Sequence, residues 1–220
     1  MAKTRILLAD DHTFLLQACQ KMLESEFDIP AVFTDGRSLV EKAPGLKPDV
    51  IIVDISMPLL NGLDAAKELK KLIPGVKMIF LTMYPDADLA REAISAGASA
   101  YLLKTSAASE LIKAIHEALK GRVYVTPAIA RAIQNSFVEN PEPKFVSREL
   151  TPRQREVLQL LAEGRPMKEA AYILKVSTRT IAFHKYRMME QLRLKSSAEL
   201  IQFAVSQHLV SPKAGLTLQR

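Results

Sequence analysis

Short runs of branched apolar residues alternate with helically spaced apolar residues over the first 120 residues of this chain. The runs are rich in Ile, Val and Leu, which is typical of strands that are buried on both faces of a parallel sheet. Gly or Pro stands at most of the joins between runs and helical stretches. The pattern predicts five β-α units in a doubly wound α/β domain with right-handed crossovers. The predicted strands are Arg5–Ala9, Ala31–Thr34, Val50–Val53, Lys77–Leu81 and Ala100–Leu103.

The pattern changes after Gly121, where no further strand is predicted. Thr126 followed by Pro127 is typical of a helix N-cap and first helical position, and it predicts a helix that runs toward Phe137. The segment Glu139–Lys144 contains two prolines and predicts an extended linker.

Four helices are predicted beyond this linker, so the second domain is expected to be all-α. Thr151, Pro152 and Gln154 form a capping-box pattern at the start of the first helix, and Gly164 ends it. Ser196 and Glu199 form a second capping-box pattern at the start of the last. The two helices between them are expected over Pro166–Leu174 and Ser177–Gln191.

The two halves of the chain differ in charge. From Met1 to Val125 there are 15 basic and 16 acidic residues, a net charge of −1, and from Thr126 to Arg220 there are 15 and 8, a net charge of +7. This asymmetry predicts two domains with different partners, the second a polyanion. A solvated basic surface without a partner is the alternative.

Several classes of protein are disfavoured by the sequence. The longest apolar stretch, Val50–Leu60, contains Asp54 and is shorter than the roughly 18 to 20 apolar residues of a membrane span. Only Ile6–Ala9 could serve as the core of a signal peptide, which is too short. Cys19 is the only cysteine, which excludes an internal disulfide and a multi-cysteine zinc site. We expect a protein of the cytoplasm without membrane contact.

Polar residues follow four of the predicted strands: Asp10 and Asp11, then Asp54, Thr82 and Lys104. The carboxyl ends of parallel strands meet at one edge of a sheet, where ligands bind. Each residue alone has a structural explanation, such as a helix cap, but together they suggest chemistry. Carboxylates suit Mg²⁺, and an aspartate can accept a phosphoryl group. A divalent cation and Lys104 would offset the repulsion of the incoming anion, and Thr82 can bond a phosphoryl oxygen.

These residues resemble the receiver domain of bacterial two-component response regulators over residues 3 to 121. The resemblance is carried by Asp10-Asp11, Val53–Gly62, Leu81-Thr82 and Tyr101–Lys104. It implies that Asp54 is the phospho-acceptor. It also implies that Asp11, Asp54 and the backbone carbonyl of Ser56 surround Mg²⁺, with Asp10 acting largely through water.

The resemblance further implies that Thr82 and Tyr101 form a switch pair. A hydroxyl drawn toward the phosphoryl group leaves space that an aromatic ring can fill, which gives two discrete packings. The alternative for Tyr101 is a packing residue of an edge strand. Thr105 departs from the proline that many receivers have after the lysine, and Met83 and Tyr84 are expected to affect the lifetime of the phosphoryl group.

The second domain fits a helix-turn-helix whose recognition helix is Ser177–Gln191. At 100° per residue, Ile181, Met188 and Leu192 point inward. The outer face carries Arg179, Ala182, Phe183, Tyr186 and Arg187, with Lys185 near its rim. The cations can bind phosphates or guanine edges, and Phe183 can contact a thymine methyl. The alternative is that Phe183 and Tyr186 contact a protein. His184 borders the apolar stripe and is expected to be a packing residue.

The runs Leu150–Leu158, Ala162–Gly164 and Val176–Ile181 look like the LuxR-type helix-turn-helix over about residues 147 to 212. With the receiver, this suggests the NarL/FixJ class of response regulators. Ala182 and Tyr186 depart from positions that are usually basic, so base readout is expected to be shifted or weak. The DNA-contacting residues implied by the resemblance and the helix face are Lys168, Ser177, Thr178, Arg179, Thr180, Phe183, Lys185, Tyr186 and Arg187.

The sequence thus predicts a receiver over residues 1–122, a linker helix and linker over 123–146, and a DNA-binding domain over 147–212. The expected function is a transcription factor, not an enzyme. A partner histidine kinase would phosphorylate Asp54 in the presence of Mg²⁺, and a homodimer formed on phosphorylation or on DNA would bind double-stranded DNA.

Two other readings remain open. An aspartyl-phosphate phosphatase would need a second carboxylate two residues after Asp54, where the chain has Ser56. A phospho-regulated protein-interaction regulator, with weak or lost DNA readout, would use Phe183 and Tyr186 to hold a protein.

Overall fold

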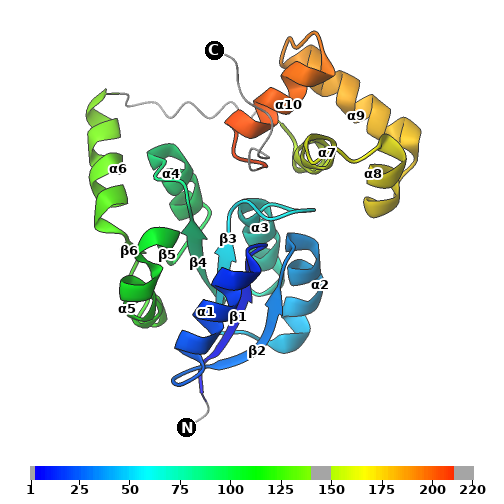
Figure 1. Cartoon of the computed structure of the whole chain (residues 1–220). Coiled ribbons are helices and arrows are strands. Elements are labelled where there is room, and N and C mark those ends of the chain that lie inside the picture. Colours follow the sequence, from blue (N-terminus) through cyan, green and yellow to red (C-terminus); the bar gives the residue numbers. More distant parts are fainter. Residues whose placement is uncertain (1–2, 140–149, 211–220) are drawn as a thin grey trace. The chain divides into compact units, whose positions relative to one another are not determined.

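The computed structural model describes residues 3–139 and 150–210, apart from the side chains of residues 137–139. The chain divides into two compact units, residues 1–145 and 146–220. The first unit is built around a parallel sheet and the second is helical (Figure 1). The predicted fold class, α/β followed by all-α, is therefore confirmed. The predicted linker over Glu139–Lys144 falls almost entirely outside the described residues.

The sheet has the strand order β2-β1-β3-β4-β5-β6, and every pair of neighbours is parallel. Its order reverses between β1 and β3, which places a topological switch point at their carboxyl ends. The strands are β1 (Arg5–Ala9), β2 (Asp28–Phe33), β3 (Val50–Asp54), β4 (Lys77–Thr82), β5 (Ala100–Leu103) and β6 (Tyr124–Val125).

Two strands differ from the sequence expectation. Strand β2 begins three residues earlier than predicted and includes Pro30, which is tolerated because β2 lies at the edge of the sheet. Strand β6 was not predicted at all, because two residues are too short to carry a periodic signal. It pairs with β5 and forms the opposite edge.

Helices cover both faces of the sheet (Figure 1). On one face, α1 (Thr13–Leu23) and α5 (Ala107–Leu119) pack on one set of strand side chains. On the other face the core is closed by α2 (Gly36–Leu46), α3 (Gly62–Leu72), α4 (Ala87–Ser95) and α6 (Pro127–Glu139). A short 3₁₀ turn, Lys104–Ser106, follows β5. Successive strand residues alternate between the two cores, as the pleat requires.

The second unit contains the four predicted helices α7 (Pro152–Ala162), α8 (Met167–Ile173), α9 (Thr178–Gln191) and α10 (Ser197–Ser206). Thr151 and Gln154 form the predicted reciprocal capping box. Gly164, with a φ of +86°, ends α7 in the left-handed conformation that glycine adopts readily. The second box is only half formed, because Glu199 accepts from the N–H of Lys195 instead of that of Ser196.

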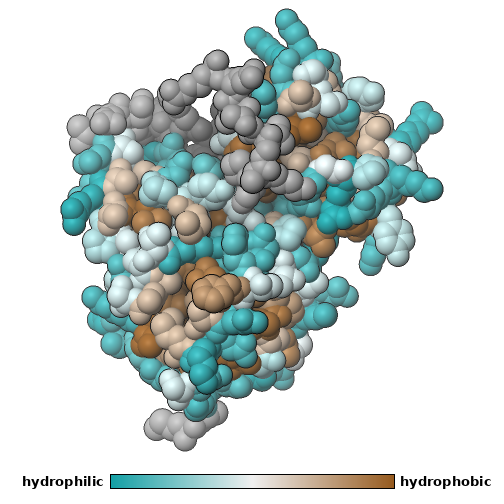
Figure 2. All heavy atoms as spheres, in the orientation of Figure 1, coloured by the Kyte–Doolittle hydropathy of each residue, from teal (hydrophilic) through white to brown (hydrophobic). Residues whose placement is uncertain are grey.

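The visible face of the first unit is mostly polar, but apolar residues reach the surface over α1 (Figure 2). Phe14, in the first turn of this helix, is 84 % exposed. Within the described residues, no helix is long and apolar enough to cross a membrane.

Candidate functional site

Three charged side chains from three strand ends meet at the switch point of the sheet. The ammonium of Lys104, after β5, lies 2.6 Å from Oδ2 of Asp10 and 3.0 Å from Oδ2 of Asp54. Asp10 follows β1 and Asp54 ends β3, so the strand register brings them side by side. All three side chains are about 95 % buried. Such a group persists in the core only because each charge has a partner.

Burial and ion pairing shift the pKa values of Asp54 and Lys104 in opposite directions. Burial raises the pKa of Asp54, and the nearby Lys104 opposes this rise. Burial alone would lower the pKa of Lys104, but Asp54 and Asp10 together raise it above its usual range. Lys104 therefore stays protonated. Any further positive charge nearby would stabilise the ionised carboxylate of Asp54.

Asp11 and His12 extend the cluster toward solvent. Nδ1 of His12 lies 2.9 Å from an oxygen of Asp11 and 3.0 Å from one of Asp10. The ligand atoms of Asp10, Asp11, His12 and Asp54 all lie within 4.8 Å of one another. Three carboxylates at this spacing suit a hard divalent cation that keeps part of its water shell.

The loop after β3 holds Asp54 in place. Ser56 is buried, and among the described residues its hydroxyl has no hydrogen-bond partner. The N–H of Gly62 donates to the carbonyl of Ile55 at 2.7 Å. A Cβ on Gly62 would lie only 2.0 Å from the carbonyl oxygen of Asp54, so the close approach of α3 to the site requires glycine.

Thr82 and Tyr101 lie together in the core, and neither is exposed. The Tyr101 hydroxyl donates to the carbonyl of Tyr84 at 3.3 Å, and the N–H of Tyr84 donates to the Thr82 hydroxyl at 3.1 Å. Burial raises the pKa of Tyr101, and a hydrogen bond with Thr82 opposes that rise. The switch hypothesis gives the ring of Tyr101 two positions, one inside the core and one outside it. In this structure the ring lies inside the core.

Helix α9 separates an inner from an outer face. Ile181 and Met188 are fully buried, and Leu192 is half-buried, as the helical spacing predicts. His184 is also half-buried and contacts the ring of Phe183 edge-on, which fits a packing role. The Ser177 hydroxyl caps the helix by accepting from the N–H of Thr180 at 3.1 Å.

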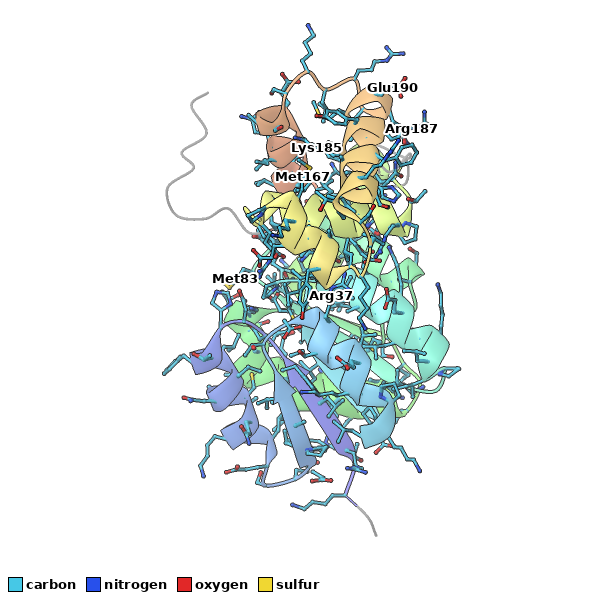
Figure 3. The ribbon with its side chains drawn as sticks, turned by 90° about the vertical axis from the view of Figure 1, so that its right-hand side faces the viewer. Arg37, Met83, Met167, Lys185, Arg187 and Glu190 are labelled. Carbon is cyan, nitrogen blue, oxygen red and sulfur yellow. The ribbon has the colours of Figure 1, made fainter. Side chains whose placement is uncertain are left out.

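Most of the predicted DNA-contacting side chains are exposed. Phe183 and Tyr186 are 60 % and 63 % exposed, whereas Thr180, Ala182 and Lys185 are half-buried. The ammonium of Lys185 lies over the Tyr186 ring, 5.8 Å from its centre. Figure 3 shows Lys185, Arg187 and Glu190 along this helix. The other exposed positions are Lys168, Ser177, Thr178, Arg179 and Arg187.

Sequence reasoning missed three contributors to these arrangements. His12 follows directly after the two aspartates, and this adjacency is the signal that could have identified it. The role of Tyr84 rests on its backbone, so its side chain gave no clue. Gly62 was recognised as the end of the Val53–Gly62 motif, but the close approach of α3 to Asp54 that requires glycine there was not.

A parallel sheet with an acidic pocket at its switch point, followed by a basic helix-turn-helix, defines a class of protein: the DNA-binding response regulators. Comparison with known families agrees. Residues 6–116 match the response regulator receiver domain, and residues 148–204 match the bacterial regulatory proteins of the luxR family. The chain belongs to this family of response regulators, in which a receiver is joined to a LuxR-type helix-turn-helix.

Curated relatives and solved structures span the whole arrangement. The oxygen regulatory protein NreC of Staphylococcus carnosus is 34 % identical over 94 % of this chain and 99 % of its own length. A structure of the Salmonella typhimurium response regulator RcsB matches with a TM-score of 0.64 and 27 % identity, covering 94 % of this chain and 99 % of that one. An RcsB–DNA complex matches with a TM-score of 0.58 and 27 % identity, covering 93 % of this chain and 98 % of that one. The chain is a DNA-binding two-component response regulator.

Proposed function

We propose that Asp54 is the phosphorylation site and that its phosphorylation controls DNA binding by the second unit. The observation that carries this proposal is the position of Asp54, which is buried at the end of β3, 3.0 Å from Lys104 and within 4.8 Å of Asp10 and Asp11. Asp10 is buried as deeply and lies 2.6 Å from Lys104, but it follows β1, whereas Asp54 is the last residue of the central strand β3.

The donor set fits Mg²⁺, which would be held by Asp11, Asp54 and the Ser56 carbonyl, with Asp10 acting through water. When bound, the cation supplies charge that offsets the repulsion between the carboxylates and an incoming phosphoryl group. A carboxylate oxygen of Asp54 attacks the phosphorus of a phosphohistidine. The bond from phosphorus to the imidazole nitrogen breaks, and the imidazole leaves with that electron pair. Lys104 then exchanges its contact with Asp54 for one with a phosphoryl oxygen.

The phosphoryl donor in this scheme is a sensor histidine kinase. The surface that surrounds the pocket suits a protein donor, because Phe14 is 84 % exposed only three residues after Asp11. An exposed aromatic ring beside a charged pocket offers the apolar centre that protein contacts favour.

Phosphorylation would draw Thr82 toward the phosphoryl group and hold Tyr101 in its inner position. To move a two-state receiver from 1:99 to 99:1 requires about 5.5 kcal/mol of differential stabilisation. Several contacts share that energy in this proposal: the cation, Lys104 and Thr82.

The second unit would bind double-stranded DNA as a homodimer, with α9 in the major groove. A two-fold dimer would bind half-sites whose centres are related by the roughly 10-bp turn of DNA. The solved relatives include RcsB dimers bound to DNA. We assign residues 1–122 to the receiver, 123–146 to the linker and 147–212 to the DNA-binding domain. Because the DNA target of a bacterial regulator is chromosomal, we place the protein in the cytoplasm.

A salt titration of binding to short duplex DNA, with and without acetyl phosphate and Mg²⁺, tests both halves of the proposal. We expect a steep decrease in affinity with salt, since contacts to phosphates release counterions, and tighter binding after phosphorylation. A steep salt dependence without a phosphoryl effect would contradict the switch. Absence of binding at low salt would contradict the DNA-binding role of α9.

A second candidate function is favoured by the exposure of Phe183 and Tyr186. In it, α9 holds a partner protein and DNA readout is weak. Loss of protein binding in Phe183→Ala, without any DNA binding at low salt in the wild type, would support this candidate. If the wild type binds DNA and Phe183→Ala lowers that affinity, this candidate function is excluded.

A further inference from the structure

Strand β6 fixes the start of the linker helix α6 to the backbone of Tyr101. Tyr101 pairs with Val125 in the β5–β6 ladder. The N–H of Thr126 donates to the carbonyl of Tyr101 at 3.1 Å, and α6 begins at the next residue. The switch residue and the helix that leads toward the second unit are therefore joined by main-chain hydrogen bonds.

Thr126 also connects α6 with the segment that carries Lys104. Its hydroxyl accepts from the N–H of Leu103 at 3.3 Å and donates to a carboxylate oxygen of Glu110 at 3.0 Å. The Tyr124 hydroxyl donates to the same oxygen at 3.1 Å. The predicted helix-capping threonine is thus held by β5 and α5, and Leu103 directly precedes Lys104 in the chain.

The apolar face of α6 closes the core over Tyr101. Ile129 is fully buried and belongs to the same hydrophobic cluster as Tyr101 and Leu89, and Ile133 packs against that cluster. Helix α6 lies beside α4 (Figure 1) and is in contact with it. The ring of Tyr101 cannot leave the core on this side without disturbing the side chains that enclose it, because packed interiors shift between discrete arrangements.

We propose that α6 docks on α4 and β5 only while Tyr101 is turned inward, so that α6 passes the state of the switch to the DNA-binding unit. This inference rests on the proposed phosphorylation of Asp54. If phosphorylation favours the inward ring and the inward ring favours docking, then phosphorylation and docking stabilise each other, since coupling between sites is reciprocal. Release of α6 adds up to 13 residues to the connection between the units and loosens the control of one by the other.

The experiment measures thiol reactivity in the full-length chain. Cys19 is the only natural cysteine and is buried, so a thiol introduced by Ile133→Cys, at the docked face, can be followed with Ellman's reagent. Asn135→Cys, at an exposed position of the same helix, is the matched control. Intact mass spectrometry on the same samples shows whether acetyl phosphate with Mg²⁺ has added a phosphoryl group.

We expect phosphorylation to slow labelling of Ile133→Cys by on the order of fivefold, the lower end of typical coupling between sites. Labelling of Asn135→Cys should not change. Hydrogen exchange of wild-type amides 128–139 provides a measurement that does not depend on the introduced thiol, and it should slow in parallel. A phosphorylated chain in which neither rate changes would overturn the coupling and leave the proposed function standing.

A second arm needs no phosphorylation. Tyr101→Ala should speed hydrogen exchange of amides 128–139, and Tyr101→Phe, which keeps the ring, should restore most of the protection. Should the chain accept no phosphoryl group, the proposed function falls, and this arm decides the link between Tyr101 and α6 by itself. Equal exchange in the wild type and Tyr101→Ala would overturn it.

Discussion

The two functional regions of this protein are built in opposite ways. The receiver pocket concentrates a few charges in the core, where Asp10, Asp54 and Lys104 are about 95 % buried and within 3.0 Å of their partners. Helix α9 spreads its cations over an exposed surface, where Arg187 and Glu190 form an ion pair with both side chains mostly in solvent. Buried charges interact strongly and depend on geometry, whereas exposed ones act mainly through their number.

A single substitution in the receiver pocket should therefore abolish its function, whereas a single substitution on α9 should lower the affinity for DNA only in part.

Asp54→Ala should abolish labelling by acetyl phosphate, because it removes the carboxylate that would form the acyl phosphate. Intact mass spectrometry should find no added phosphoryl group. Asp28→Ala, which removes an exposed carboxylate at the far end of β2, is the matched control and should be labelled like the wild type. A stable adduct in Asp54→Ala would sink the assignment of the phospho-acceptor.

Gly62→Ala should destabilise the first unit by roughly 2–3 kcal/mol, because the added Cβ would lie 2.0 Å from the Asp54 carbonyl oxygen. Urea unfolding, followed by circular dichroism, measures the change. Gly45→Ala in α2 is the control, since an added Cβ there meets nothing within 4 Å. If both variants unfold at the same urea concentration, the close contact of Gly62 with the Asp54 carbonyl does not limit stability.

Arg179→Ala and Arg187→Ala should each weaken DNA binding at low salt. Each should also reduce the slope of log affinity against log salt by about one, if each side chain contacts one phosphate. Fluorescence anisotropy at several salt concentrations measures this slope. A loss of all binding from one of these substitutions would show that α9 depends on specific geometry, as the pocket does.

Asp54→Asn should stabilise the metal-free protein at neutral pH, because the amide carries no charge that burial penalises. Burial raises the pKa of Asp54 above its unfolded value, so the ionised form costs stability once the pH exceeds the folded-state pKa. The advantage of the variant should therefore shrink as the pH falls through that pKa. Thermal unfolding without divalent cations at several pH values tests this. An advantage that grows toward acid would contradict the sign.

Glu190→Gln should strengthen DNA binding by a factor of roughly two, the smallest of these effects. The substitution frees Arg187 from its partner, 3.4 Å away, and removes a negative charge from α9. Glu169→Gln on α8, where the carboxylate pairs with Arg165, is the control and should change affinity less. Anisotropy at low salt can resolve the difference. Equal changes in both variants would indicate a general effect of net charge.

The same contrast explains what the sequence could predict. Asp10, Asp54, Thr82 and Lys104 were identifiable because each stands at the end of a buried strand, and parallel strands bring such ends together. The burial of Ile181 and Met188 followed from helical spacing alone. These features depend on periodicity, which a single sequence displays.

Other features depend on tertiary contacts that leave no local signal. Strand β6 exists because β5 offers a free edge, and Thr126 bonds Glu110 and Leu103 because that strand brings it there. The incomplete second capping box is a local exception, because Glu199 accepts from the N–H of Lys195, four residues earlier, instead of that of Ser196. The DNA-contacting role of each residue on α9 stays a prediction, because exposure alone does not distinguish a base contact from a solvated side chain.

The two edges of the sheet affect the solubility of the protein. An unpaired strand edge can recruit a strand from another molecule and start aggregation. Here one edge is β2, where Pro30 has no N–H to offer, and the other is β6, which is only two residues long. Neither edge provides a long uninterrupted template, because Pro30 interrupts β2 and β6 is short. In the proposed dimer on DNA, the two edges would therefore not join neighbouring copies through their sheets.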